Sequence, residues 1–205
     1  MTGTHAILLK FTGTLGDEAI LAAALATVAR QSGLEVANLH GHAKEGEGGN
    51  ELYAYLELSA AQELSAADTT RVAGIARNLP PFSGLTVEAA RLTRMFETQG
   101  ASSGERAPYH YIVETDSAEG WMDEIIRWYD SEHMPGLAAV PGAVRAQRYI
   151  NLDGAPRSLA CYDLVTTDTL GCPAWLAIRF TEWSDRVRPN FRNTKRTMFR
   201  SLSSI

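Results

Sequence analysis

The 205-residue sequence has little cysteine, no excess of positive charge and no long apolar run. Its two cysteines, Cys161 and Cys172, are too few for a disulfide framework and lack CxxC spacing, so both are expected to be reduced thiols. A net charge of −5 argues against nucleic acid as a partner. No segment has the roughly eighteen consecutive apolar residues of a membrane span. The composition predicts a folded protein that acts neither on nucleic acid nor in a membrane.

Several familiar signatures are also missing. Residues 1–4 lead directly into an apolar, extended pattern, without the basic flank and cleavage site of a signal peptide, so we expect a cytoplasmic location. The sequence has no GxGxxG after a strand, no GxxxxGK[ST] and no GxSxG elbow. These absences argue against dinucleotide-binding, P-loop and α/β-hydrolase proteins.

What the sequence does contain is an architectural repeat. In the first half, Asp17 is a candidate helix cap, Gly33 a helix stop, and residues 46–50 a glycine-rich hairpin loop. Apolar periodicity and these signals predict the order β-α-β-β-α-β over residues 5–12, 17–31, 34–42, 51–58, 60–78 and 85–97. The second half predicts the same order over residues 110–115, 118–133, 143–150, 157–165, 169–180 and 194–201.

The repeat predicts the domain organisation and the fold class. We expect a lobe over residues 1–99, a small, polar linker at 100–108 and a second lobe over 109–205. A β-α-β-β-α-β unit is the ferredoxin-like arrangement, in which both helices cover one sheet face. The prediction is therefore an α+β protein whose two tandem ferredoxin-like lobes pack sheet to sheet as an internal dimeric α/β barrel. This internal pseudo-dimer leaves a further homodimer open.

The helix that opens the second half carries a histidine. Met122, Ile125, Ile126 and Tyr129 recur at helical spacing, and His133 continues their stripe toward the interior. Pro135 disfavours helical geometry in the preceding residue, so the helix is expected to end near His133. The negative end of the helix dipole, with Asp130 nearby, would then favour an imidazolium.

Two segments of the second half resemble the EthD-like proteins of the dimeric α/β-barrel superfamily. The segments are Trp128-Tyr129-Asp130-Ser131-Glu132-His133-Met134-Pro135 and Val140-Pro141-Gly142-Ala143 with Arg148-Tyr149. They are similar to the pattern W-Y-x-x-E-H-x-P … V-P-G-x-x-x-x-x-R-Y, and the likeness covers about residues 108–200. The resemblance implies a ligand cavity between sheet and helices. Proteins of this superfamily include polyketide cyclases, decarboxylases, cofactor-free monooxygenases, lactone isomerases and haem-dependent peroxidases, so the fold alone does not choose the chemistry.

Three residues are candidates for catalysis. His133 is expected to be a general acid or base, because an imidazole titrates near neutrality. His110 would face the same cavity in one of the two strand registers, and is otherwise a strand-end residue. Tyr129 could supply a phenolic hydrogen bond, although aromatic residues at helical spacing are also ordinary core residues.

Five further residues are candidates for binding the substrate. Trp128, Tyr149 and Tyr162 would supply aromatic walls. Arg148 and Arg188 could bind a carboxylate or phosphate. Arg188 lies in residues 179–200, which hold seven basic residues against Glu182 and Asp185; a solvated segment paired with acids elsewhere is the simpler interpretation.

The leading hypothesis is a cofactor-independent lyase, cyclase or isomerase that acts on a small aromatic or polyketide-like substrate. His40 and His42 share a strand face at a spacing compatible with a metal, but nothing in the sequence completes a site, so no metal and no cofactor are expected. Two alternatives remain, namely an oxygenase or haem-dependent oxidative enzyme and a non-catalytic small-ligand binding or stress-response module. The first lobe lacks the histidine signature, and we expect it to be mainly a packing partner.

Overall fold

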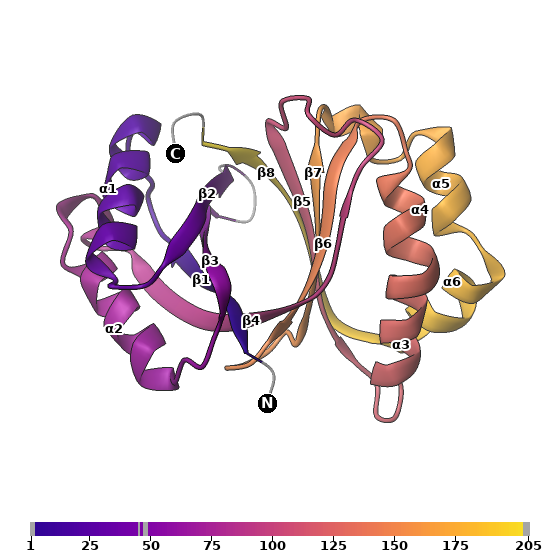
Figure 1. Cartoon of the computed structure of the whole chain (residues 1–205). Helices are drawn as coiled ribbons and strands as arrows, with labels where there is room; N and C mark the ends of the chain where they lie inside the picture. Colours follow the sequence, from indigo (N-terminus) through magenta and orange to yellow (C-terminus); the bar gives the residue numbers. More distant parts are fainter. Residues whose placement is uncertain (1–2, 45, 47–48, 203–205) are drawn as a thin grey trace. The chain divides into compact units, whose positions relative to one another are not determined.

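A computed structural model describes residues 3–44, 46 and 49–202, which form two compact units (Figure 1). The first unit comprises the described residues up to Arg94, Asn151–Gly154 and the described residues from Phe199 on. The second unit comprises Met95–Ile150 and Ala155–Met198. The strands are antiparallel throughout, and the predicted α+β class is confirmed. None of the helices in the described segments is long and apolar enough to span a membrane.

The first unit has the strand order β4-β1-β3-β2 of a ferredoxin-like sheet. Its two helices lie together on one side of that sheet (Figure 1). The elements are β1 Thr4–Thr12, α1 Glu18–Gln31, β2 Val36–Lys44, β3 Glu51–Gln62, α2 Ala66–Arg77 and β4 Thr86–Gln99, with a short 3-10 turn, η1, at Pro80–Phe82. The predicted hairpin loop at 46–50 lies partly outside the described residues.

Local capping chemistry sets the helix ends of the first unit. The Asp17 carboxylate accepts hydrogen bonds from the backbone N–H groups of Ala19 and Ile20, as expected for an N-cap. The prediction that the second helix starts at residue 60 is wrong, because strand β3 continues to Gln62. Ser65 and Asp68 then form a capping box that starts α2.

The second unit repeats the order of elements, with β5, β7 and β6 side by side. The helices of this unit cover one face of its strands (Figure 1). The elements are β5 Tyr109–Ser117, α3 Met122–Trp128, η2 Tyr129–His133, α4 Met134–Ala138, β6 Ala143–Asn151, β7 Ser158–Leu164, η3 Thr167–Thr169, α5 Pro173–Arg179, α6 Glu182–Val187, η4 Arg188–Asn190 and β8 Phe191–Ser201. The helix predicted over 169–180 is shorter, since α5 begins at Pro173, and a second helix, α6, which the Thr181 side chain caps, follows outside the predicted range.

The segment predicted as a linker is bonded to the second unit. The backbone N–H groups of Gly100 and Ser102 donate to the carbonyl groups of Val144 and Ala143. The division between the units falls between Arg94 and Met95, inside β4, because this strand is long enough to contribute residues to both units.

The helix that carries the histidine does not end at His133, so that prediction is wrong. It continues to Ala138 through a π-helical turn at Tyr129–His133, in which the N–H of Met134 donates to the carbonyl of Tyr129. Pro135 falls in the first turn of α4, where a missing N–H is tolerated. Single π-turns inside α-helices are frequent at functional sites.

The strand registers decide which side chains face these helices. Tyr111 and Val113 on β5 belong to the apolar core of the second unit, which also contains Trp128 and Tyr129. Because side chains alternate along a strand, His110 points to the opposite face of the sheet. The helix side of the sheet is therefore lined by aromatic and aliphatic residues.

Candidate functional site

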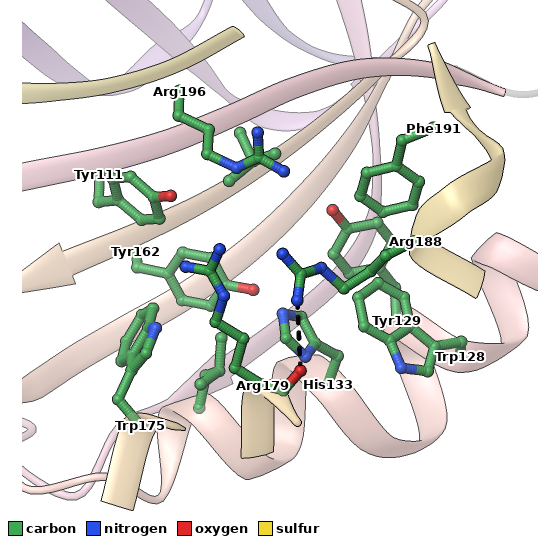
Figure 2. A pocket seen from close by; sticks show the side chains of 12 residues that line it. Tyr111, Trp128, Tyr129, His133, Tyr162, Trp175, Arg179, Arg188, Phe191 and Arg196 are labelled. Atoms are coloured by element: carbon green, nitrogen blue, oxygen red, sulfur yellow. Dashed lines mark hydrogen bonds between the residues drawn. The ribbon is translucent and has the colours of Figure 1, made fainter. Parts of the chain in front are cut away.

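The second unit contains a narrow, half-open pocket between its sheet and its helices (Figure 2). The cavity volume is about 30 Å³, and the whole hollow with its open mouth is about 400 Å³. The lining residues are Tyr111, Val113, Trp128, Tyr129, His133, Leu137, Tyr162, Trp175, Arg179, Arg188, Phe191 and Arg196. Six of these side chains are tyrosine, tryptophan or phenylalanine, and none is acidic.

The aromatic side chains form two groups on either side of the pocket (Figure 2). In one group, the ring centroids of Tyr162 and Trp175 are 5.3 Å apart, and Tyr111 lies 6.2 Å from each. In the other group, Phe191 stacks on Tyr129 at 6.0 Å and meets Trp128 edge-on at 5.9 Å. Because the rings of each group pack against one another, each side of the pocket presents an apolar aromatic wall.

His133 lies between these groups, on the π-turn. Its ring stacks on Trp128 with centroids 4.1 Å apart, and its Nδ1 atom is buried without a hydrogen-bond partner among the described residues. Burial, together with the positive charges of Arg188 and Arg179, lowers the pKa of His133 to about 3. The imidazole is therefore neutral at physiological pH and has an unused nitrogen inside the pocket.

The expectation of an imidazolium at a helix end is thus wrong. The helix continues past His133, so no negative dipole end stabilises a proton there. Asp130 does not compensate either, because both of its carboxylate oxygens accept hydrogen bonds from Arg148, at 2.9 and 2.8 Å.

Three arginines enter the pocket from three different elements. Arg179 is at the end of α5, Arg188 starts η4, and Arg196 is on β8 (Figure 2). The Arg188 guanidinium donates to the backbone carbonyl of Arg179 at 3.5 Å, and the Nε of Arg179 is buried without a partner among the described residues. Burial and the neighbouring arginines lower the pKa of Arg188. The pocket is thus positively charged.

The tyrosine hydroxyl groups of the pocket stay protonated. Burial raises the pKa of Tyr111, Tyr129 and Tyr162 above the ordinary value. The Tyr162 hydroxyl donates to the Met134 sulfur at 2.9 Å, a weak acceptor that a ligand oxygen could replace. These hydroxyl groups can therefore donate hydrogen bonds to a ligand but do not act as bases.

A hydrogen-bond network behind the pocket fixes the indole on which His133 stacks. Trp128 Nε1 donates to the buried Ser184 hydroxyl at 3.2 Å. The Thr181 hydroxyl donates to Glu132 at 2.6 Å and lies 2.9 Å from the Ser184 oxygen. These bonds tie the π-turn to α6 and hold Trp128 in place.

Five of the predicted site residues line the pocket. They are His133, Tyr129, Trp128, Tyr162 and Arg188. Three do not, namely His110, Arg148 and Tyr149.

The expectation that His110 shares the cavity of His133 is wrong. His110 lies on the opposite sheet face, where its Nδ1 is 2.7 Å from Asp163. Arg148 is fully buried in its pair with Asp130, and Tyr149, the next residue on β6, points away from the helices. The strand register, which the sequence left open, accounts for these differences.

Sequence reasoning missed seven lining residues as individual candidates, namely Tyr111, Val113, Leu137, Trp175, Arg179, Phe191 and Arg196. The basic stretch at 179–200 did signal Arg179 and Arg196, although Arg186 in the same stretch pairs with Glu124, as the simpler interpretation expected. Tyr111 would have followed from the correct register of β5.

The first unit has a shallow, apolar groove of about 460 Å³ along α1 and the η1 turn. It is lined by Ala19, Ile20, Ala23, Ala24, Thr27, Leu79 and Pro81. On β2, the Nδ1 of His42 lies 3.1 Å from the Ser201 hydroxyl, and His40 lies 3.6 Å from Glu57.

Comparison with known proteins supports the fold. No family model matches the sequence, and no curated protein matches it. A candidate monooxygenase of Fusobacterium nucleatum subsp. nucleatum superposes with a TM-score of 0.65 over 99% of this chain and 94% of its own, at 9% identity. An anthrone oxidase-like protein superposes with a TM-score of 0.59 over 97% of this chain and 91% of its own, at 14% identity.

A third solved structure carries the fold in its description. It is a ferredoxin-fold protein of Listeria monocytogenes related to antibiotic biosynthesis monooxygenases, with a TM-score of 0.53 over 97% of this chain and 95% of its own, at 10% identity. At such low identities the likeness shows the fold alone, which is ferredoxin-like.

Proposed function

We propose that this protein is a cofactor-independent, EthD-like enzyme that transfers a proton on a small aromatic or polyketide-like substrate, with His133 as the proton acceptor. The observation that carries the proposal is the Nδ1 atom of His133, which is buried and unpartnered in the wall of an aromatic pocket. A neutral imidazole in this position is ready to take a proton from a bound substrate.

The residues around His133 suit each part of this reaction. The two aromatic groups would hold a flat substrate, with Trp128 and Tyr129 on one side and Tyr162 on the other. His133 removes a proton from an acidic C–H, and the electron pair moves to the conjugated carbonyl oxygen, which becomes an enolate. Arg188 and the protonated Tyr162 hydroxyl would stabilise that negative charge.

The fate of the enolate separates the possible reactions. Return of the proton to another carbon gives an isomerisation, and attack on a second carbonyl group gives a cyclisation. Oxidation by O₂ as co-reactant is the alternative, because an electron-rich enolate is the species that O₂ attacks. The positively charged pocket favours this alternative, since it would also stabilise the reduced oxygen species.

Haem fits the pocket poorly. The only histidine of the lining is His133, whose ring lies flat against Trp128, and the cavity between the lining side chains is only about 30 Å³. A wide porphyrin would require these walls to separate.

Proton transfer can be tested without knowing the natural substrate. A panel of aromatic ketones and hydroxyaromatic acids, anthrone among them, is incubated with the protein in D₂O, and deuterium uptake is followed by NMR. We expect catalysed exchange for at least one compound, and a loss of about 100-fold or more in His133→Gln, the typical worth of an acid–base group. The matched control is His40→Gln, a histidine of the first unit.

Each other outcome has a clear meaning. An undiminished exchange rate in His133→Gln would show that His133 is not the proton acceptor. Oxygen uptake during exchange, measured with an oxygen electrode, would favour the oxidative alternative. Compounds that bind tightly and are recovered unchanged and undeuterated would favour a binding module and contradict the enzyme proposal.

A further inference from the structure

The charges of the pocket are not balanced by the protein itself. Among the described residues, the guanidinium groups of Arg179, Arg188 and Arg196 have no carboxylate within ion-pair distance, and no lining residue is acidic. Grouping like charges in a partly buried space is unfavourable unless an anion joins them. The arrangement is that of an anion site whose counter-charge must come from a ligand.

The nearby acids are already engaged or turned away. On the helix of His133, Asp130 is paired with Arg148 on β6, and Glu132 accepts from Thr181. Asp185 on α6 is exposed and lies outside the lining; its charge acts on Arg188, but the two side chains form no ion pair. The remaining titratable groups around His133 are the tyrosines of β5, β7 and its own helix, which stay neutral. A negative charge beside His133 can therefore come only from a bound ligand.

The shape and donors of the pocket indicate the chemistry of that ligand. Aromatic rings flank a narrow space, and guanidinium and phenol groups, all hydrogen-bond donors, converge on it (Figure 2). A planar guanidinium matches a carboxylate through two parallel hydrogen bonds. An aromatic ring that carries a coplanar carboxylate satisfies both the flat walls and the donors.

We propose that the ligand is an aromatic carboxylate whose carboxylate group binds among Arg179, Arg188 and Arg196, and that this bound anion makes His133 a competent proton acceptor. The proposal rests on the proposed function, because it names the substrate class of the same site. The physical reason is that burial and the charges of Arg188 and Arg179 both disfavour a proton on His133, and an anion seated between the arginines cancels the second effect. Without the ligand, His133 is therefore a weaker base.

Binding measurements test the first half of the proposal. Isothermal titration calorimetry compares benzoate with benzamide, its uncharged analogue, and with phenyl phosphate and inorganic phosphate. We expect benzoate to bind at least 10-fold more tightly than benzamide, and to lose about 10-fold or more in Arg188→Gln or in the exposed-site variant Arg196→Gln. Arg192→Gln is the matched control, because Arg192 is exposed, lies outside the lining and bonds only to backbone carbonyl groups.

Three binding results would overturn the proposal. Equal affinity for benzamide would show that the site does not select an anion. Equal affinity for inorganic phosphate would show that it does not select an aromatic carboxylate. Unchanged affinity in both arginine variants would show that the arginines do not bind the carboxylate. Arg196→Gln preserves the test if Arg188→Gln fails to fold, since Arg196 is exposed.

NMR of the His133 ring tests the second half without any turnover. In the free protein we expect the ring to stay neutral down to about pH 4, and in the benzoate complex to take up a proton at a pH at least one unit higher. Arg188→Gln should produce a similar change without ligand. A titration midpoint of the His133 ring that does not move when benzoate binds would contradict the proposal that the bound anion makes His133 a proton acceptor. If both halves hold and no deuterium exchange is found, only the proposed proton transfer fails.

Discussion

A single imidazole shows how strongly its surroundings can set the charge of a residue. His133 stacks on Trp128 and faces two guanidinium groups, so its pKa falls to about 3 although an unperturbed histidine titrates near pH 6.5. The chemistry available to the pocket is therefore that of a neutral base.

This low pKa predicts acid sensitivity of the fold. Between about pH 6.5 and pH 3 the unfolded chain binds a proton on His133 that the folded chain does not, so the free energy of unfolding falls as the pH decreases through this window. At about pH 4.5 the loss from this one group is on the order of 2–3 kcal/mol.

The measurement is urea denaturation of the wild type and of His133→Gln at about pH 7 and pH 4.5. Because the variant has no imidazole to protonate, its loss of stability between the two pH values should be smaller than that of the wild type by roughly 2–3 kcal/mol. Equal losses of unfolding free energy in the two proteins would show that the pKa of His133 is not lowered by folding.

Among the elements, the contact between α4 and α5 places a wall of the pocket. A Cβ atom added at Gly136 on α4 would lie 2.9 Å from Cγ2 of Ile178 on α5, the helix that also carries Trp175 and Arg179. The close approach of these two helices depends on the missing side chain.

Substitution of Gly136 therefore tests this contact. Gly136→Ala should destabilise the fold by roughly 1 kcal/mol, because the added Cβ meets the stiff, β-branched side chain of Ile178 and this overpacking outweighs the gain in helix propensity. Gly136→Leu should cost roughly 1–3 kcal/mol through overpacking and displace α5. Chemical denaturation and the fluorescence of Trp175 report the two effects, and a Leu variant as stable as the wild type would contradict the packing argument.

The sequence predicted most elements because their signals are local. The cap at Asp17, the stop at Gly33 and the alternating strands all depend on neighbouring residues. The π-turn could not be predicted, since a stripe of apolar residues does not reveal one extra residue in a turn. The site was predicted in part: His133 and its helix followed from periodicity and the resemblance, whereas Tyr111 and His110 depended on a strand register that tertiary packing chooses.

At the scale of the molecule, two units with the same order of elements differ in what they enclose. The second unit has a pocket lined by arginines without ion pairs among the described residues, and the groove described in the first unit is apolar. This difference agrees with our expectation that the chemistry belongs to the second half, which stays a prediction.

Paired substitutions in the two units test that assignment. Ala23→Phe, which fills the groove of the first unit at an exposed helix position, should leave benzoate affinity within about twofold. Phe191→Ala, which removes part of the aromatic wall in the second unit, should weaken benzoate about 10-fold, near the worth of one stacked ring. Calorimetry gives both values, and the reverse pattern would place the site in the first unit.

The π-turn at Tyr129–His133 has a genetic consequence. Loss of the single exposed residue Ser131 would let the backbone return to ordinary α-helical bonding. Five residues of a π-turn and four of an α-turn rotate the chain by nearly the same angle, so the side chains of Met134–Ala138 would keep their direction relative to Met122–Trp128. The change would be confined to the turn that carries His133, whose ring would shift although no site residue had been substituted. A single in-frame codon thus alters the catalytic turn while the rest of the helix stays packed as before.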